Sequence, residues 1–399
     1  MIRAGPSHTP PPGYVGRCRD PAIDQRRHGA DYDPAGPRPS KSAATRLDDT
    51  RLVADTLPDP GAGEAVLQVD AFAFTANNIT YAVAGDTIGY WRFFPAQGET
   101  DEGWGRIPVW GFGDVVQSNA DGVAEGDRFY GYFPMAGHLL VKPQRVSEHG
   151  FSDAAAHRAE LPPVYNNYTR SAADPAYRAD QEAMQMLFRP LFTTSFFLDD
   201  FLDDNDFFGA ATVLLTSASS KTAFGLAWLL KRNRSDRCRV VGLTSAGNAG
   251  FVEGLGCYDQ VVAYDDLASL PREPTVLVDM AGNAELRAAL HHNYADDLAY
   301  SCSVGATHWE NARMSGDEPL RGRNPACFSR RHRFKNAPRN GGPQPWRSAR
   351  QRPGRRSSRR PTVGSTCACA QHGPDAVQSI YQQVLHNRAS PSDGFILSL

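Results

Sequence analysis

The sequence predicts an α/β fold made of a β-rich domain followed by a doubly wound parallel sheet. Short strands separated by turns occupy residues 63–146, which is typical of a compact β-domain. From residue 211 onward, apolar strand-like runs alternate with helical patterns, which predicts a parallel sheet with right-handed crossovers. The chain of 399 residues, 41% of them hydrophobic, is long enough for two cores.

The N-terminal extension, residues 1–48, is rich in Pro, Arg and Ser and shows no helix or strand period, so we expect it to be disordered. It lacks the apolar stretch of a signal peptide, and no apolar run approaches the roughly 20 residues that a membrane helix needs. The seven cysteines are scattered rather than arranged as a disulfide framework. These features predict a cytoplasmic protein without a membrane partner.

The predicted β-rich domain covers residues 49–205. Strands bounded by Gly or Asp are expected at residues 64–69, 109–116 and 128–133. Residues 150–205 have a more helical pattern. We interpret them as a helical insertion whose aromatic side chains pack in a core.

The second domain is predicted at residues 206–320. Its buried parallel strands are expected as continuous apolar runs at residues 212–216, 239–243, 260–264 and 275–279. Helices are expected at residues 221–231, from the second strand to about residue 255, and at residues 284–291.

Residues 321–372 lose this periodicity. Residues 321–360 hold thirteen Arg and one Lys, and no Asp or Glu lies in the whole segment. The segment could bind nucleic acid, form a long disordered loop, or be translated out of frame, since a wrong frame in GC-rich DNA tends to yield Arg, Pro, Gly and Ser. We favour the third hypothesis, because residues 373–399 return to the pattern of a helix and a strand. Nucleic acid is therefore not an expected partner.

The end of the first parallel strand carries the candidate cofactor site. Parallel sheets bind ligands at this end, and the helix that follows offers N–H groups and a dipole that attract phosphate. Small or polar residues there would let the backbone approach a pyrophosphate: Ser217, Ala218, Ser219, Ser220, Lys221, Thr222 and Ala223. A strand-to-helix turn with a serine cap is the alternative. A P-loop is excluded, because Ser220 and Leu215 stand where that motif requires glycine.

The end of the second strand indicates which nucleotide would bind. It carries Thr244 and Ser245 rather than the Asp or Glu that holds the ribose 2′-hydroxyl of NAD. Such an acid would repel a 2′-phosphate, whereas the two hydroxyls could donate hydrogen bonds to it. The pattern favours NADP (NADPH) over NAD, although no Arg follows at once. A second helix cap would give the same pair of residues.

Taken in order, these segments resemble the zinc-independent quinone reductases of the medium-chain dehydrogenase/reductase superfamily. The similar segments are residues 111–131, 192–196, 216–229, 241–265, 278–282 and 377–399. The resemblance covers about residues 60–320 and 373–399, and within the superfamily it indicates an uncharacterised bacterial branch. It implies a GroES-like domain joined to a Rossmann-type doubly wound sheet.

The resemblance also implies site residues. Thr194 would border the nicotinamide, and Tyr264 and Ala281 would complete the cofactor site. The candidate catalytic residues are Tyr81, which lies where the family lines its active-site cleft, and Tyr165, which belongs to a polar aromatic cluster in the expected insertion. A structural role is the alternative for both tyrosines.

The chain departs from the family at two places. Ser220, Lys221 and Ala223 replace glycines of the cofactor loop, so Lys221 could pair with a phosphate or crowd the backbone. The Gly-His-Glu pattern of zinc-dependent members is missing, since Leu139 follows His138, and we expect no metal.

These observations together predict an NADPH-dependent oxidoreductase that transfers hydride to a small-molecule carbonyl, enone or quinone without a metal. The alternative is a non-catalytic NADP(H)-binding protein or an inactive, damaged homologue. A homodimer is compatible with the sequence, which does not define the oligomeric state.

Overall fold

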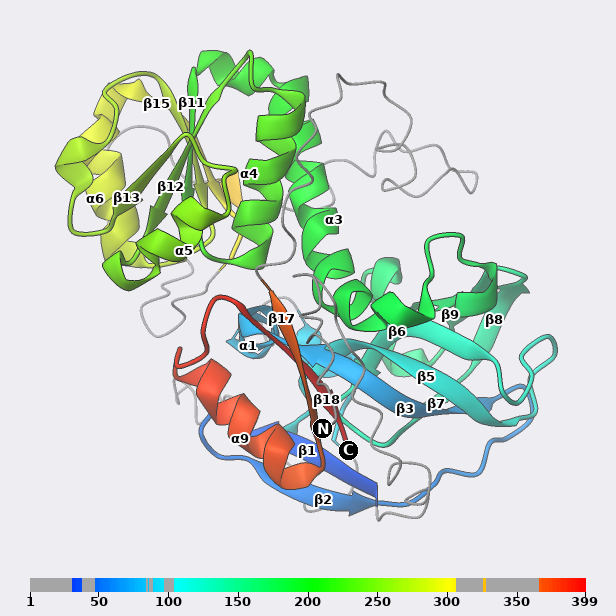
Figure 1. Ribbon diagram of the computed structural model, residues 1–399. Coiled ribbons are helices and arrows are strands. Elements are labelled where there is room, and N and C mark those ends of the chain that lie inside the picture. The colour runs from blue at the N-terminus through cyan, green and yellow to red at the C-terminus, as the bar shows by residue number, and fades with distance from the viewer. Residues whose placement is uncertain are drawn as a thin grey trace, which may run out of the picture.

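The computed structural model describes residues 31–37, 47–83, 85, 89–96, 104–305, 326–327 and 366–399 (Figure 1). Two bodies lie at the two ends of the long helix α3 (Glu182–Asp204). One is a parallel sheet with helices on both faces, and the other is a larger, mostly antiparallel sheet. The expected α/β fold class is thereby confirmed.

The β-rich domain is built on strands whose apolar side chains fill a large core, while a smaller cluster packs against the start of α3. Among the described residues its sheet has nine strands, in the order β17-β18-β3-β5-β6-β10-β9-β8, with β7 paired to β3. The first strands are β3 (Ala65–Phe74), β5 (Pro108–Ser118), β6 (Arg128–Pro134), β7 (His138–Val141) and β8 (Pro143–Ser147). Helices α1 (Ala76–Val83) and α9 (Pro374–Leu385) bury their apolar faces in the same core.

The N-terminal extension contains one strand that the sequence did not reveal. Strand β1 (Asp31–Pro37) pairs antiparallel with β2 (Arg51–Asp55) and with β4 (Trp104–Gly105). Disorder is therefore the wrong expectation for residues 31–37, because strand pairing satisfies their backbone groups without an apolar period. The expectation for residues 1–30 and 38–46 lies outside the described residues.

The segment expected to be a helical insertion is only partly helical. Strands β9 (Gly150–Asp153) and β10 (Asn167–Arg170) pair with each other, and β10 also pairs with β6. Short 3-10 turns fill most of the way to α3. The helical prediction failed for β10 because its residues are mostly polar and do not alternate with apolar ones. Pairing with β6 and β9 makes this segment a strand.

The second domain has the strand order of a dinucleotide-binding fold. Its parallel sheet runs β13-β12-β11-β14-β15-β16, which is the doubly wound order 3-2-1-4-5-6. The strands are β11 (Thr212–Thr216), β12 (Arg239–Thr244), β13 (Gln260–Ala263), β14 (Thr275–Asp279), β15 (Leu298–Ser303) and β16 (Ala326–Cys327). Helices α4 (Lys221–Asn233), α5 (Ala249–Gly254) and α6 (Ala284–Tyr294) connect them.

The C-terminal segment returns to the β-rich domain. Strand β18 (Asp393–Ser398) pairs antiparallel with β3, and β17 (Cys367–His372) lies parallel to β18 at the sheet edge. The C-terminal strand and helix are thus preceded by a further strand that begins at Cys367, before the expected residue 373, because β18 supplies its pairing partner. Apart from residues 326–327 and 366–372, the Arg-rich segment 321–372 lies outside the described residues.

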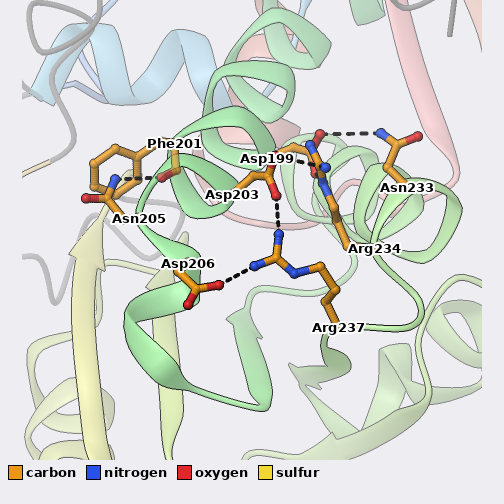
Figure 2. Close-up of polar contacts among 8 residues, drawn as sticks. All are labelled: Asp199, Phe201, Asp203, Asn205, Asp206, Asn233, Arg234 and Arg237. Carbon is orange, nitrogen blue, oxygen red and sulfur yellow. Dashed lines mark hydrogen bonds and ion pairs between the residues drawn. The ribbon is translucent and has the colours of Figure 1, made fainter.

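Helix α3 is attached to both domains. At its start, Glu182 accepts hydrogen bonds from Arg128 of β6 (Nε to Oε1, 2.8 Å). At its end, Asp203 pairs with Arg234 (2.9 Å) and Arg237 (2.5 Å) of the second domain (Figure 2). The buried Asp199 also pairs with Arg234, at 3.3 Å. These ion pairs hold α3 at the boundary where the candidate site lies.

Candidate cofactor site

The turn from β11 into α4 has a conformation that its neighbours enforce. Ser217 has a φ of 49°, a left-handed backbone conformation that costs energy for a residue with a side chain. Its N–H donates to the hydroxyl of Tyr264 (3.1 Å), and its carbonyl accepts from the N–H of Ser220 (2.8 Å). The hydroxyl of Tyr258 donates to the carbonyl of Ala218 (2.8 Å). The hydroxyls of two tyrosines thus bind the Ser217 N–H and the Ala218 carbonyl of this turn.

Helix α4 begins directly after this turn. Ser220 is its N-cap, and the Ser220 hydroxyl accepts from the N–H of Ala223 at 3.4 Å. The first N–H groups of a helix have no partner within the helix, so those of Lys221 and Thr222 are open to a ligand. Ser219, Lys221 and Thr222 are partly exposed, whereas Ala218 and Ala223 are buried. The turn therefore offers small side chains and unpaired N–H groups at one point.

A buried polar cluster fixes the neighbouring end of β14. Asp279 is 2% exposed, and its Oδ1 accepts from the Thr216 hydroxyl (2.7 Å) and from the N–H groups of Ala281 and Gly282 (both 3.1 Å). Arg287 balances the carboxylate charge at 3.3 Å. Because its N–H is engaged here, Ala281 contributes shape rather than a free donor to the edge of the site.

The ends of β12 and β13 complete this edge of the sheet. Thr244 is 1% exposed, whereas Ser245 is partly exposed. Asn248, in the following turn, donates to the Ser219 hydroxyl at 3.4 Å. Burial raises the pKa of Tyr264 to about 12, so this tyrosine stays a neutral hydroxyl at physiological pH. The carboxyl ends of four strands therefore meet at the start of α4 without a carboxylate at the end of β12.

Lys221 is directed away from this edge. Its Nζ donates to the carbonyl oxygens of Asp393 (2.6 Å) and Pro391 (3.4 Å), which belong to the β-rich domain. Burial lowers the pKa of the Lys221 amine from its ordinary value of 10.5 to about 8, and the charge of Asp393 opposes this shift. The side chain thus joins two domains.

Helix α3 borders the turn from the other side. The Ser195 hydroxyl donates to the carbonyl of Thr222 at 2.8 Å, and a Cβ on Gly225 would lie 2.9 Å from the same hydroxyl. Thr194 is adjacent and partly exposed, and its hydroxyl donates within α3 to the carbonyl of Pro190 (3.4 Å). Ser195 and Tyr258 were not predicted from the sequence. Both hydroxyls donate to backbone carbonyls, and such contacts have no sequence motif.

The two candidate catalytic tyrosines belong to the aromatic core of the β-rich domain. Tyr81 and Tyr165 are 7% and 8% exposed. Tyr90 lies between them: its hydroxyl is 3.0 Å from that of Tyr165, and its ring centroid is 4.5 Å from that of Tyr81. The structure brings Tyr81 and Tyr165 into one cluster with each other, while the cofactor-loop residues gather in the other domain.

A surface recess of about 400 Å³ lies elsewhere on the second domain. It is lined by residues at the amino ends of the strands, including Ala211, Asp236 and Arg239. Open α/β sheets bind ligands at the carboxyl ends of their strands. We therefore place the candidate site at the start of α4 rather than in this recess.

Within the residues that the structure describes, no three His, Cys, Asp or Glu side chains come together as a metal site. His138, the residue before the Leu139 that breaks the zinc-dependent pattern, lies on β7 and is partly buried. No helix of the described part combines the length and the apolar character that crossing a bilayer requires.

The sequence matches one protein-family model over residues 72–390, which is most of the chain. That family is described as a protein of unknown function, DUF2855. The chain belongs to this family. No curated protein matches it by sequence.

Solved structures share the fold at low sequence identity. CurA from Vibrio vulnificus in complex with NADPH is 11% identical, with a TM-score of 0.56 over 92% of this chain and 98% of CurA. Mycobacterial Rv1454c complexed with NADPH is 12% identical, with a TM-score of 0.53 over 93% and 100%. The YhdH oxidoreductase from Salmonella enterica in complex with NADP is 11% identical, with a TM-score of 0.50 over 92% and 99%.

All three likenesses extend over nearly the whole of both chains, so they include the β-rich domain as well as the parallel sheet. The fold that the sequence resemblance implied is thereby confirmed. A family without an assigned function also agrees with the expected uncharacterised branch.

Proposed function

We propose that this protein is an NADPH-dependent oxidoreductase that reduces a small carbonyl, enone or quinone compound. The observation that carries the proposal is the turn between β11 and α4. It places small side chains and unpaired helix N–H groups at the carboxyl edge of a sheet with dinucleotide-binding order.

The residues of this edge fit a dinucleotide. The N–H groups of Ser219, Lys221 and Thr222 would hold the pyrophosphate, and the left-handed Ser217 shapes the turn beneath them. Ser245 would face the 2′-phosphate, because β12 ends without an acid that would repel it. Thr194 and the turn at Ala281 would border the nicotinamide. When bound, NADPH would supply the hydride.

The relatives support the choice of cofactor. CurA and Rv1454c were solved with NADPH, and YhdH with NADP. For the substrate we propose a place between the start of α4 and the β-rich domain, whose aromatic core contains Tyr81 and Tyr165. Because both hydroxyls are buried in an aromatic core, we assign them a role in shape before any role in proton transfer.

The test is NADPH oxidation by the purified chain with a panel of quinones, enones and aldehydes. The matched variants are Ser220→Asp and Ser220→Asn, since both residues cap a helix well. Only the aspartate places a charge beside the expected pyrophosphate, so Ser220→Asp should lower kcat/KM at least about tenfold relative to Ser220→Asn. NADPH binding without turnover of any acceptor would instead indicate a non-catalytic cofactor-binding protein. Equal activity of the two variants would remove the turn from the site.

A further inference from the structure

Lys221 occupies a place where physical chemistry disfavours a cation. It is the first residue of α4, and the positive end of a helix dipole repels an ammonium group. Burial adds a desolvation cost, which hydrogen bonds to the amine must offset. In this protein two hydrogen bonds do so, and both acceptors lie about 170 residues away, on the last turn of the other domain.

The receiving turn is held by its own hydrogen bonds. The N–H of Asp393 donates to the carbonyl of Ser390 (2.9 Å), and the Asp393 carboxylate accepts from the N–H of Ser390 (3.1 Å). The carbonyl of Ser392 accepts from the N–H of Cys367 at 2.8 Å. Strand β18 then continues from Asp393 and pairs with β3 in the sheet of the β-rich domain. The Lys221 amine therefore binds to a fixed part of that sheet.

A second contact lies at the same turn, so the flexible side chain of Lys221 is not the only link between this turn and its neighbours. A Cβ on Gly394 would lie 2.5 Å from Leu187 of α3, so the absence of a side chain there lets α3 pack directly on β18. The rings of the next residue of α3, Phe188, and of Phe224 have centroids 6.1 Å apart, which brings α3 against α4. The starts of α4 and β18 are thus both packed against the first turns of α3.

We propose that Lys221 is a contact between the two domains that fastens the start of α4 to the β18 turn, and that its amine does not bind a cofactor phosphate. The inference rests on the proposed function, because the start of α4 is the proposed cofactor site. Both acceptors are backbone carbonyls, so the contact needs no particular partner side chain. A phosphate contact would require the amine to break both hydrogen bonds.

The experiment compares Lys221→Met with Lys231→Met, a lysine on the same helix whose partner, Asp259, lies within the second domain. Two quantities are measured: hydrogen–deuterium exchange of peptides covering residues 388–394, and the Kd for NADPH by fluorescence titration. Loss of a charged hydrogen bond should accelerate exchange in Lys221→Met about tenfold. Exchange in Lys231→Met should match wild type within about twofold. The Kd of Lys221→Met should stay within about threefold of wild type, since backbone N–H groups hold the phosphates.

Unchanged exchange at residues 388–394 in Lys221→Met would overturn the proposal, and so would a rise of about tenfold or more in its Kd, because the latter is the signature of a lost phosphate contact. If Lys221→Met does not fold, Lys221→Gln replaces it. The glutamine amide keeps donors, and a smaller acceleration in the same peptides supports the proposal, whereas none contradicts it. A wild-type protein that fails to bind NADPH would defeat the proposed function, while the exchange measurement still tests the contact itself.

Discussion

At the scale of single residues, we propose that the side chain after β12 determines which cofactor is preferred. Ser245 is partly exposed at the end of that strand, next to the turn whose Asn248 contacts Ser219. A neutral residue there admits a 2′-phosphate, whereas a carboxylate repels it and binds the free ribose hydroxyl of NADH. The choice between the two cofactors is therefore open to a single substitution.

We predict that Ser245→Asp raises the Kd for NADPH at least about tenfold and leaves that for NADH unchanged or lower, because the new carboxylate meets the 2′-phosphate. Ser245→Asn, of equal size and without charge, is the control and should keep the NADPH preference. Titration of each variant with both nucleotides measures the effect. Equal losses of NADPH affinity in Asp and Asn variants would show that the residue acts through shape.

The amine of Lys221 gives the protein a stability term that depends on pH. Its folded pKa of about 8 lies below the ordinary 10.5, so the folded state binds fewer protons than the unfolded state between these values. The burial cost is fully present below pH 8 and is relieved as the pH rises towards 10.5, with Asp393 as the charged neighbour of the amine. We predict that the free energy of unfolding of wild type rises relative to Lys221→Met across this window, by at most about 1.4 kcal/mol per pH unit. Urea denaturation at pH 7.5, 8.5 and 9.5 checks this, and a constant difference would contradict it.

At the scale of elements, the approach of α3 to α4 depends on one glycine. A Cβ on Gly225 would lie 2.9 Å from the Ser195 hydroxyl, which donates to Thr222. Intrinsic helix propensity favours alanine over glycine by about 1 kcal/mol. Because the crowding outweighs this gain, the two helices must separate or the Ser195 hydrogen bond must break.

We therefore predict that Gly225→Ala lowers the free energy of unfolding by about 1–3 kcal/mol. The matched control is Gly250→Ala in α5, where an added Cβ would meet no atom within 4 Å. This variant should be neutral or up to about 1 kcal/mol more stable. Denaturant titration of both proteins measures the difference, and a stabilised Gly225→Ala would show that α3 and α4 do not pack as described.

The elements that the sequence predicted well are those whose burial is continuous. Strands β11 and β14 have the predicted bounds, because a parallel strand covered on both faces is an uninterrupted apolar run. Strand β10 was missed because its residues are mostly polar and its pairing partners lie elsewhere in the chain. The same reason hid β1 and β17, which are strands only through their neighbours.

The candidate site was likewise predictable from the sequence only in part. The position of the turn at residues 217–223 was predictable, since a buried apolar strand ends before it and a helical pattern begins after it. The direction of the Lys221 side chain was not, because its acceptors are the carbonyls of Pro391 and Asp393, and a backbone carbonyl leaves no mark in the sequence. Likewise, the burial of Tyr81 and Tyr165 in one aromatic core could not be predicted, because it depends on how distant segments pack.

At the scale of the whole molecule, several contacts join the two domains. Helix α3 is tied to the β-rich domain through Arg128 and Glu182, and to the second domain through Arg234 and Arg237 (Figure 2). The β18 turn adds a direct contact to the start of α4 through Lys221. A cofactor at the start of α4 would therefore face the β-rich domain across a boundary that several contacts fix.

Whether the start of α4 binds NADPH is tested most simply by the effect of the nucleotide on thermal unfolding. The thermal midpoint of the purified protein should rise with NADPH concentration, because a ligand that binds only the folded state adds about 2.7 kcal/mol at one hundred times its Kd. The rise with NADH should be smaller, and Ser220→Asp should abolish the NADPH effect while Ser220→Asn retains it. No shift with NADPH in a protein that unfolds cooperatively would contradict the account.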